Sequence, residues 1–96
     1  MNLSTLILKQ KLVLPNGLVR EAVIWKAAKS HKYPEGVRYR LALVDPFTGE
    51  VLVLFDNHFP KGHHKHLRGA ESSYRFDSVT QLVDDFLEIC EKEEAK

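Results

Sequence analysis

Alternating apolar and polar side chains mark the first part of the chain as a series of β-strands. The alternation runs from Leu3 to Leu14 and again from Leu18 to Ala28, with the two-residue period of a strand that buries one face. Between these segments, Asn16-Gly17 tolerates the positive φ of a tight turn. We therefore expect the two segments to form a hairpin.

The middle of the chain continues this pattern. Alternation returns from Val37 to Val44, a turn signal follows from Asp45 to Gly49, and Val51 to Phe55 is apolar on both faces. An all-apolar segment of this length is typical of a central strand that is covered on both sides. Tyr74 to Phe76 is a candidate for a short last strand, which gives an antiparallel sheet of four or five strands.

Near the end of the chain the period changes to that of a helix. Apolar residues recur at helical spacing from Val79 to Cys90, after a capping box in which Ser78 is the N-cap and Gln81 reaches back to it. Packing this stripe against the sheet gives an α+β fold: a meander of hairpins closed by one C-terminal amphipathic helix. The stripe consists of Val79, Leu82, Val83, Phe86, Leu87 and Cys90.

Size and composition limit the alternatives. With 96 residues, of which 44% are apolar and 28% charged, the chain is expected to be a single globular domain over residues 1–96. No run approaches the roughly 20 apolar residues that cross a bilayer, and no signal peptide is recognisable, so we expect no membrane association. Cys90 is the only cysteine, which fits a reducing, cytoplasmic compartment.

The most unusual segment of the chain lies between Asn57 and Arg68. It holds four of the five histidines and no carboxylate, although the net charge of the whole chain is only +1. The segment is expected to be a basic loop. If it is extended, His64 and His66 share one side and His63 and Lys65 the other, all close to Asp56.

Acid–base cleavage of RNA is the first chemistry that such a loop could support. An imidazole, with an ordinary pKa of about 6.5, can take a proton from a ribose 2′-hydroxyl or donate one to the leaving oxygen. Cations would hold the phosphate, and no metal or other cofactor is required. The candidate catalytic residues are His58, His63, His64, His66 and Asp56, and the candidate phosphate-binding residues are Lys61, Lys65 and Arg68.

Other interpretations stay open at this point. Four histidines and Asp56 offer enough ligands for Zn²⁺, although their spacing matches no specific motif and nearby cations oppose a dication. The histidines could also belong to a solvated polar loop that only caps turns. Finally, the loop could be a non-catalytic binding surface for RNA or protein, and edge strands or the outer face of Val51 to Phe55 could pair in a homodimer.

The arrangement of these segments resembles the TumE-like toxin family, whose members are found beside helix-turn-helix antitoxins. The Asp-Asn-His and Gly-His-His-x-His pieces are the specific part of the resemblance. The family implies a toxin of a type II toxin–antitoxin system with a DNA-binding antitoxin as partner, and RNA as target remains our inference. The matching pieces are the opening hairpin, Tyr39–Val44, Leu54–His58, Lys61–His66, Tyr74–Phe76 and a helix with Leu82, Asp85 and Phe86.

Overall fold

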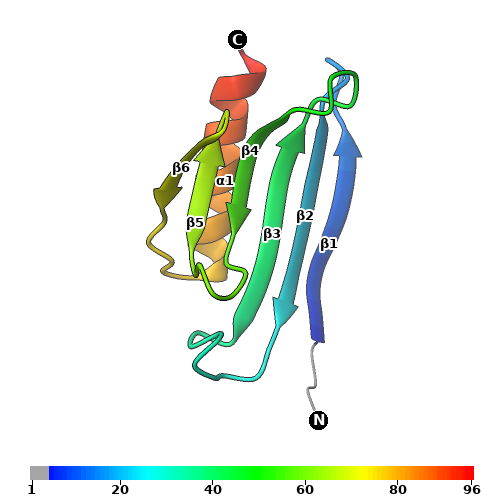
Figure 1. The fold of residues 1–96 in the computed structure, drawn as a ribbon. Helices are drawn as coiled ribbons and strands as arrows, with labels where there is room; N and C mark the ends of the chain where they lie inside the picture. Colours follow the sequence, from blue (N-terminus) through cyan, green and yellow to red (C-terminus); the bar gives the residue numbers. More distant parts are fainter. Residues whose placement is uncertain (1–4) are drawn as a thin grey trace.

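A computed structural model describes residues 5–96 as one six-stranded antiparallel sheet with a single helix on one face (Figure 1). Every strand pairs with its neighbours in the chain, so the strand order equals the sequence order and the topology is a simple meander. The elements are β1 (Thr5–Val13), β2 (Val19–Lys26), β3 (Val37–Val44), β4 (Val51–Asp56), β5 (His64–Leu67), β6 (Ala70–Ser73) and α1 (Val79–Glu94).

The predicted α+β class and meander are confirmed, but the predicted number of strands is wrong. The sheet has six strands rather than four or five, because His64–Leu67 of the expected basic loop forms β5, which pairs with β4 and β6. Tyr74 to Phe76 lies outside any strand. β5 escaped prediction because a short strand near the sheet edge buries little apolar surface and needs no apolar alternation. The predicted start at Leu3 lies outside the described residues.

The predicted turns form as expected. Gly17 has a φ of 87°, and the Leu18 amide donates to Asn16 Oδ1 at 3.0 Å, which closes the β1–β2 hairpin. Asp45 Oδ1 accepts from the Phe47 amide at 2.9 Å between β3 and β4. These local bonds fix the register that brings the side chains of separate strands into rows.

The helix begins where the capping signal predicts. Ser78 Oγ accepts a hydrogen bond from the Gln81 amide at 3.1 Å. The expected return bond from the Gln81 side chain is not formed, because its amide donates to Asp85 Oδ1 at 2.7 Å instead. This charge-assisted bond holds the Gln81 side chain along the helix, so its oxygen does not reach back to accept from the Ser78 amide. Leu82, Phe86 and Cys90 of the predicted stripe are buried.

The sheet therefore has two different faces. The face toward α1, called the covered face, contributes buried side chains to one core with the helix. The opposite face, called the open face, carries the alternate residues of the same strands. The covered face contributes Ile24, Tyr39, Leu41, Leu43, Val53 and Phe55 to this core, whereas the open face carries Val23, Trp25, Arg38, Arg40, Asp56, His64 and His66.

Within residues 5–96, the single helix is neither long nor apolar enough to cross a membrane.

Candidate functional site

A row of polar side chains crosses the open face. Register pairs Val23 of β2 with Arg40 of β3, Arg40 with Asp56 of β4, Asp56 with His64 of β5, and His64 with Ser73 of β6. Directly opposite residues in an antiparallel sheet lie about 5 Å apart and project to the same side. The meander thus places an arginine, an aspartate and a histidine beside each other on the open face.

Side-chain hydrogen bonds fix the backbone at the end of β4. The His58 amide donates to Asp56 Oδ1 at 2.6 Å, so the carboxylate caps the turn that follows the strand. Asn57, between them, is buried: its Oδ1 accepts from the Tyr39 amide at 2.9 Å and its Nδ2 donates to the Val37 carbonyl at 2.8 Å. These bonds tie the end of β4 to the start of β3 and leave His58 exposed on the open side.

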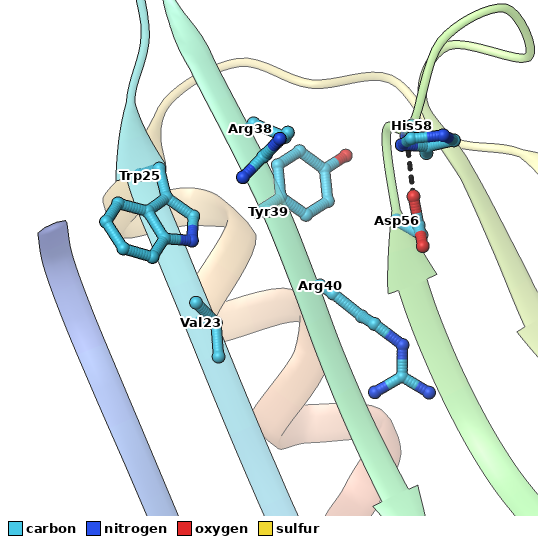
Figure 2. Close-up of a pocket in the computed structure, with 7 residues that line it drawn as sticks. All are labelled: Val23, Trp25, Arg38, Tyr39, Arg40, Asp56 and His58. Carbon is cyan, nitrogen blue, oxygen red and sulfur yellow. Dashed lines mark hydrogen bonds between the residues drawn. The ribbon is translucent and has the colours of Figure 1, made fainter. Parts of the chain in front are cut away.

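A shallow hollow of about 270 Å³ lies on this part of the open face (Figure 2). Trp25 of β2 stands on one side of it, Arg38 and Arg40 of β3 lie in the middle, and Asp56 and His58 stand on the other side. Arg40 approaches Glu21 only at 4.0 Å, and Arg38 makes no ion pair within residues 5–96. The hollow therefore combines an indole with cations that are largely free to bind an anion.

The predicted pairing of His64 and His66 on one side of the chain is confirmed. Their rings meet edge to face with centroids 5.2 Å apart. His64 Nδ1 lies 2.8 Å from the Gly62 carbonyl oxygen, and because a carbonyl can only accept, this nitrogen carries the hydrogen. His64 Nε2 makes no hydrogen bond within residues 5–96.

Glu71 of β6 completes this group. Its Oε1 lies 3.2 Å from His66 Nε2 and also accepts a hydrogen bond from Lys61 Nζ at 2.6 Å. The bond from Lys61 lowers the pKa of the Glu71 carboxyl. One carboxylate oxygen thus orients an imidazole while an ammonium group compensates its charge.

The same three side chains could hold a metal ion. One ligand atom each from His64, His66 and Glu71 lies within 4.8 Å of the others, which is the donor set of an open zinc site. The Lys61 ammonium already donates to Glu71 Oε1 at 2.6 Å, so its positive charge opposes a metal ion at this position.

His63 lies apart from this group, although it directly precedes His64 in the chain. Its Nδ1 is 2.8 Å from the Tyr39 hydroxyl and its Nε2 is 3.0 Å from Glu35 Oε1. Its ring stacks on Phe76 with centroids 4.9 Å apart. The bond with His63 lowers the pKa of the Glu35 carboxyl, and burial raises the pKa of the Tyr39 hydroxyl.

The expected convergence of all candidate side chains near Asp56 is therefore wrong. His63 bonds to Tyr39 on the covered face, and Lys65 lies opposite Phe55 on that face as well. Arg68 lies at the far end of β5, where it pairs with Glu93 at 2.8 Å and Glu50 at 3.7 Å. The reason is the strand itself, because successive residues of β5 must project to opposite sides.

The basic segment contains no carboxylate of its own, but carboxylates from other parts of the chain lie beside it in the folded protein. Glu35 and Glu71 approach it from other segments. Neither was predicted, because both depend on long-range pairing. Trp25 could have been predicted as part of this site from the sequence. It shares one face of its strand with Val23, and the next strand carries Arg38 and Arg40 on alternate positions.

Comparisons with known proteins add one finding. The model of a protein family described as Toxin TumE matches residues 3–94, nearly the whole chain. No curated protein and no solved structure matches the chain.

Proposed function

Since the chain belongs to the TumE family of toxins, it is the toxin of a toxin–antitoxin pair, and we propose that it acts by cleaving RNA at the open face without a metal ion. The observation that carries this proposal is the paired arrangement of His64 and His66. Two imidazoles lie on one exposed surface, one with a free ring nitrogen and the other oriented by a carboxylate.

His64 is the proposed general base. Its Nδ1–H is held by the Gly62 carbonyl, so Nε2 is the nitrogen that accepts the proton of a ribose 2′-hydroxyl. Gly62 has a φ of 73°, and a Cβ added there would meet no atom within 4 Å, so the backbone beside His64 is open. The attacking oxygen can therefore approach from the solvent side.

His66 is the proposed general acid. Glu71 Oε1 lies 3.2 Å from its Nε2, as carboxylates commonly face catalytic imidazoles, and so orients the ring. A nitrogen of each histidine lies within the same 4.8 Å cluster, which lets both rings reach one phosphodiester group. His64 takes the proton of the attacking oxygen, and His66 gives a separate proton of its own to the leaving oxygen.

Positive charge around the pair would bind the phosphate. Lys61 lines a hollow of about 360 Å³ together with His64 and Glu71, and Arg40 lies one strand beyond Asp56 in the same row. Such cations stabilise charge that develops on the phosphoryl oxygens. In this proposal Arg68 takes no part, because it lies at the far end of β5 beside Glu93 of α1. Lys65 takes no part either, because it projects to the covered face.

The direct test is cleavage of a defined RNA by the purified toxin in EDTA. We expect cleavage with a bell-shaped pH profile, and no cleavage of the same sequence made of DNA, which lacks the 2′-hydroxyl. Replacing His64 or His66 by alanine should slow cleavage about 10²–10⁴-fold. The matched control is Lys92→Ala, on the exposed side of α1. Full activity of both histidine variants would contradict the proposal.

A second candidate function is metal-dependent chemistry at the same group, and the His64–His66–Glu71 cluster is the observation that favours it. Here the protein would keep stoichiometric zinc on purification, and EDTA would abolish its activity. Lys61→Ala separates the two candidates. It should strengthen metal binding, because it frees Glu71, and weaken metal-independent cleavage, because it removes a phosphate contact.

The resemblance leads us to propose a helix-turn-helix protein as the antitoxin. If the open face is the working surface, the antitoxin neutralises the toxin by covering it or by holding it away from RNA. Protection of β5 and β6 from hydrogen exchange in the complex is the expected result if the face is covered.

A further inference from the structure

We infer that the hollow formed by Trp25, Arg38, Arg40 and Asp56 binds a guanine base of single-stranded RNA. This inference rests on the proposed function, because it names the nucleotide that the same face would recognise beside its histidines. The hollow lies one residue pair from His64, since Asp56 is the partner of Arg40 on one side and of His64 on the other. A base held there places its own phosphate close to His64.

The hollow pairs an aromatic ring with two guanidinium groups. Trp25 is half-buried and its side chain stands on the open face opposite Arg38. Exposed indole and guanidinium planes are the groups on which unpaired bases stack. A covering of apolar side chains would be expected instead if this part of the sheet only packed against a protein core.

The hollow also contains the carboxylate of Asp56. Asp56 Oδ1 accepts from the His58 amide, and its Oδ2 makes no hydrogen bond within residues 5–96. A carboxylate in a nucleic-acid site repels phosphate, so its use is to accept hydrogen bonds from a base. Among the four bases of RNA, only guanine offers two adjacent donors, N1–H and the N2 amino group, to one carboxylate.

Two arginines lie beside this carboxylate. Arg38 and Arg40 project from alternate positions of β3, and Arg40 is the direct partner of Asp56. An arginine donates in bidentate fashion to O6 and N7 of guanine, the edge that remains free when a carboxylate accepts from N1 and N2. Guanine is therefore the one base that satisfies both kinds of group.

Trp25 also provides the measurement, because it is the only tryptophan of the chain. The full-length His64→Ala protein is titrated with guanosine, inosine, adenosine, cytidine and uridine 5′-monophosphates while tryptophan fluorescence is recorded. Stacking of a base on Trp25 should quench its emission. The concentration for half-maximal quenching should be about 5- to 150-fold lower for the guanosine nucleotide than for the others. Inosine, which lacks the 2-amino group, should bind more weakly than guanosine.

Asp56→Asn is the decisive variant. It keeps the shape of the side chain but replaces one acceptor oxygen by a donor, so the preference for guanosine over inosine should disappear while stacking remains. Lys92→Ala should behave like the parent protein. Equal quenching by all nucleotides, no quenching, or an unchanged preference in Asp56→Asn would overturn the inference.

The guanine pocket and the proposed ribonuclease activity can be disproved separately. If the guanosine nucleotide binds as expected but wild-type protein leaves RNA intact, the pocket stands and the ribonuclease proposal falls. If RNA is cleaved at every base alike and no nucleotide quenches Trp25, the ribonuclease proposal stands and the guanine pocket falls.

Discussion

His63 and His64 are adjacent in the chain, yet they lie in two regions with opposite properties. On the covered side both ring nitrogens of His63 have partners, Tyr39 and Glu35, and its ring is stacked on Phe76. On the open face His64 is held through one nitrogen by Gly62, and its other nitrogen makes no hydrogen bond within residues 5–96. This difference supports the proposal that His63 has a structural role and that His64 exchanges a proton.

The same contrast extends along β3. Tyr39 and Leu41 of the covered face are almost fully buried, whereas Arg38 and Arg40, which alternate with them, are exposed. One strand thus supplies core packing with one set of side chains and a charged surface with the other. Changes on the covered face should therefore act on the stability of the protein, and changes on the open face should act on its activity.

The largest effect on stability is expected from Phe86→Ala. Phe86 is fully buried on α1 and meets Phe55 of β4 with ring centroids 5.8 Å apart. Its loss should lower the free energy of unfolding by about 3–5 kcal/mol, measured by urea denaturation. Phe47→Ala is the control, because that ring is 85% exposed. A loss below about 1 kcal/mol would mean that the helix does not pack as described.

Tyr39→Phe tests whether the covered-side histidine is structural. The change removes only the hydroxyl that bonds to His63 Nδ1, so we expect a loss of about 1–2 kcal/mol in stability and almost unchanged cleavage. Tyr33→Phe serves as control, since the Tyr33 hydroxyl makes no hydrogen bond within residues 5–96. If Tyr39→Phe slowed cleavage 100-fold without a change in stability, the working site would lie on the covered side.

The smallest effect concerns the contact between the β5–β6 hairpin and α1. Hydrogen bonds from Lys96 and Arg68 lower the pKa of Glu93, which is 5% exposed. Because the folded-state pKa is lowered, this carboxylate stabilises the fold above its ordinary pKa, and the contribution is lost as the pH falls through the lowered value. Glu93→Gln should cost about 1 kcal/mol at pH 7, since Arg68 is half-exposed.

The cost of Glu93→Gln should shrink as thermal unfolding is repeated at lower pH. Glu88→Gln, whose carboxylate pairs with Lys92 at the exposed surface, should unfold like the wild type at every pH. A cost that stays constant down to strongly acidic pH would show that the charge of Glu93 does not hold the hairpin.

Much of the fold could be predicted from local patterns. The bounds of β3 were predicted to the residue, and the Ser78 cap and the buried stripe of α1 were confirmed, because each depends on residues close in sequence. β5 and β6 were missed because an edge hairpin is decided by pairing with β4. Its polar residues give no periodic signal of their own.

The candidate site was predicted only in part, for the same physical reason. Alternation correctly separated His64 and His66 from His63 and Lys65. It could not reveal that Glu71 faces His66, since that contact depends on the long-range pairing of β5 with β6.

The most direct test of the account compares the two adjacent histidines in one assay. Cleavage of one RNA is followed under single-turnover conditions with wild type, His63→Gln and His64→Gln, at a temperature where circular dichroism shows all three folded. The account predicts a loss of about 10²–10⁴-fold for His64→Gln and a change of only a few-fold for His63→Gln. The reverse order, or an RNA left intact by the wild type, would contradict the assignment of the open face as the working surface.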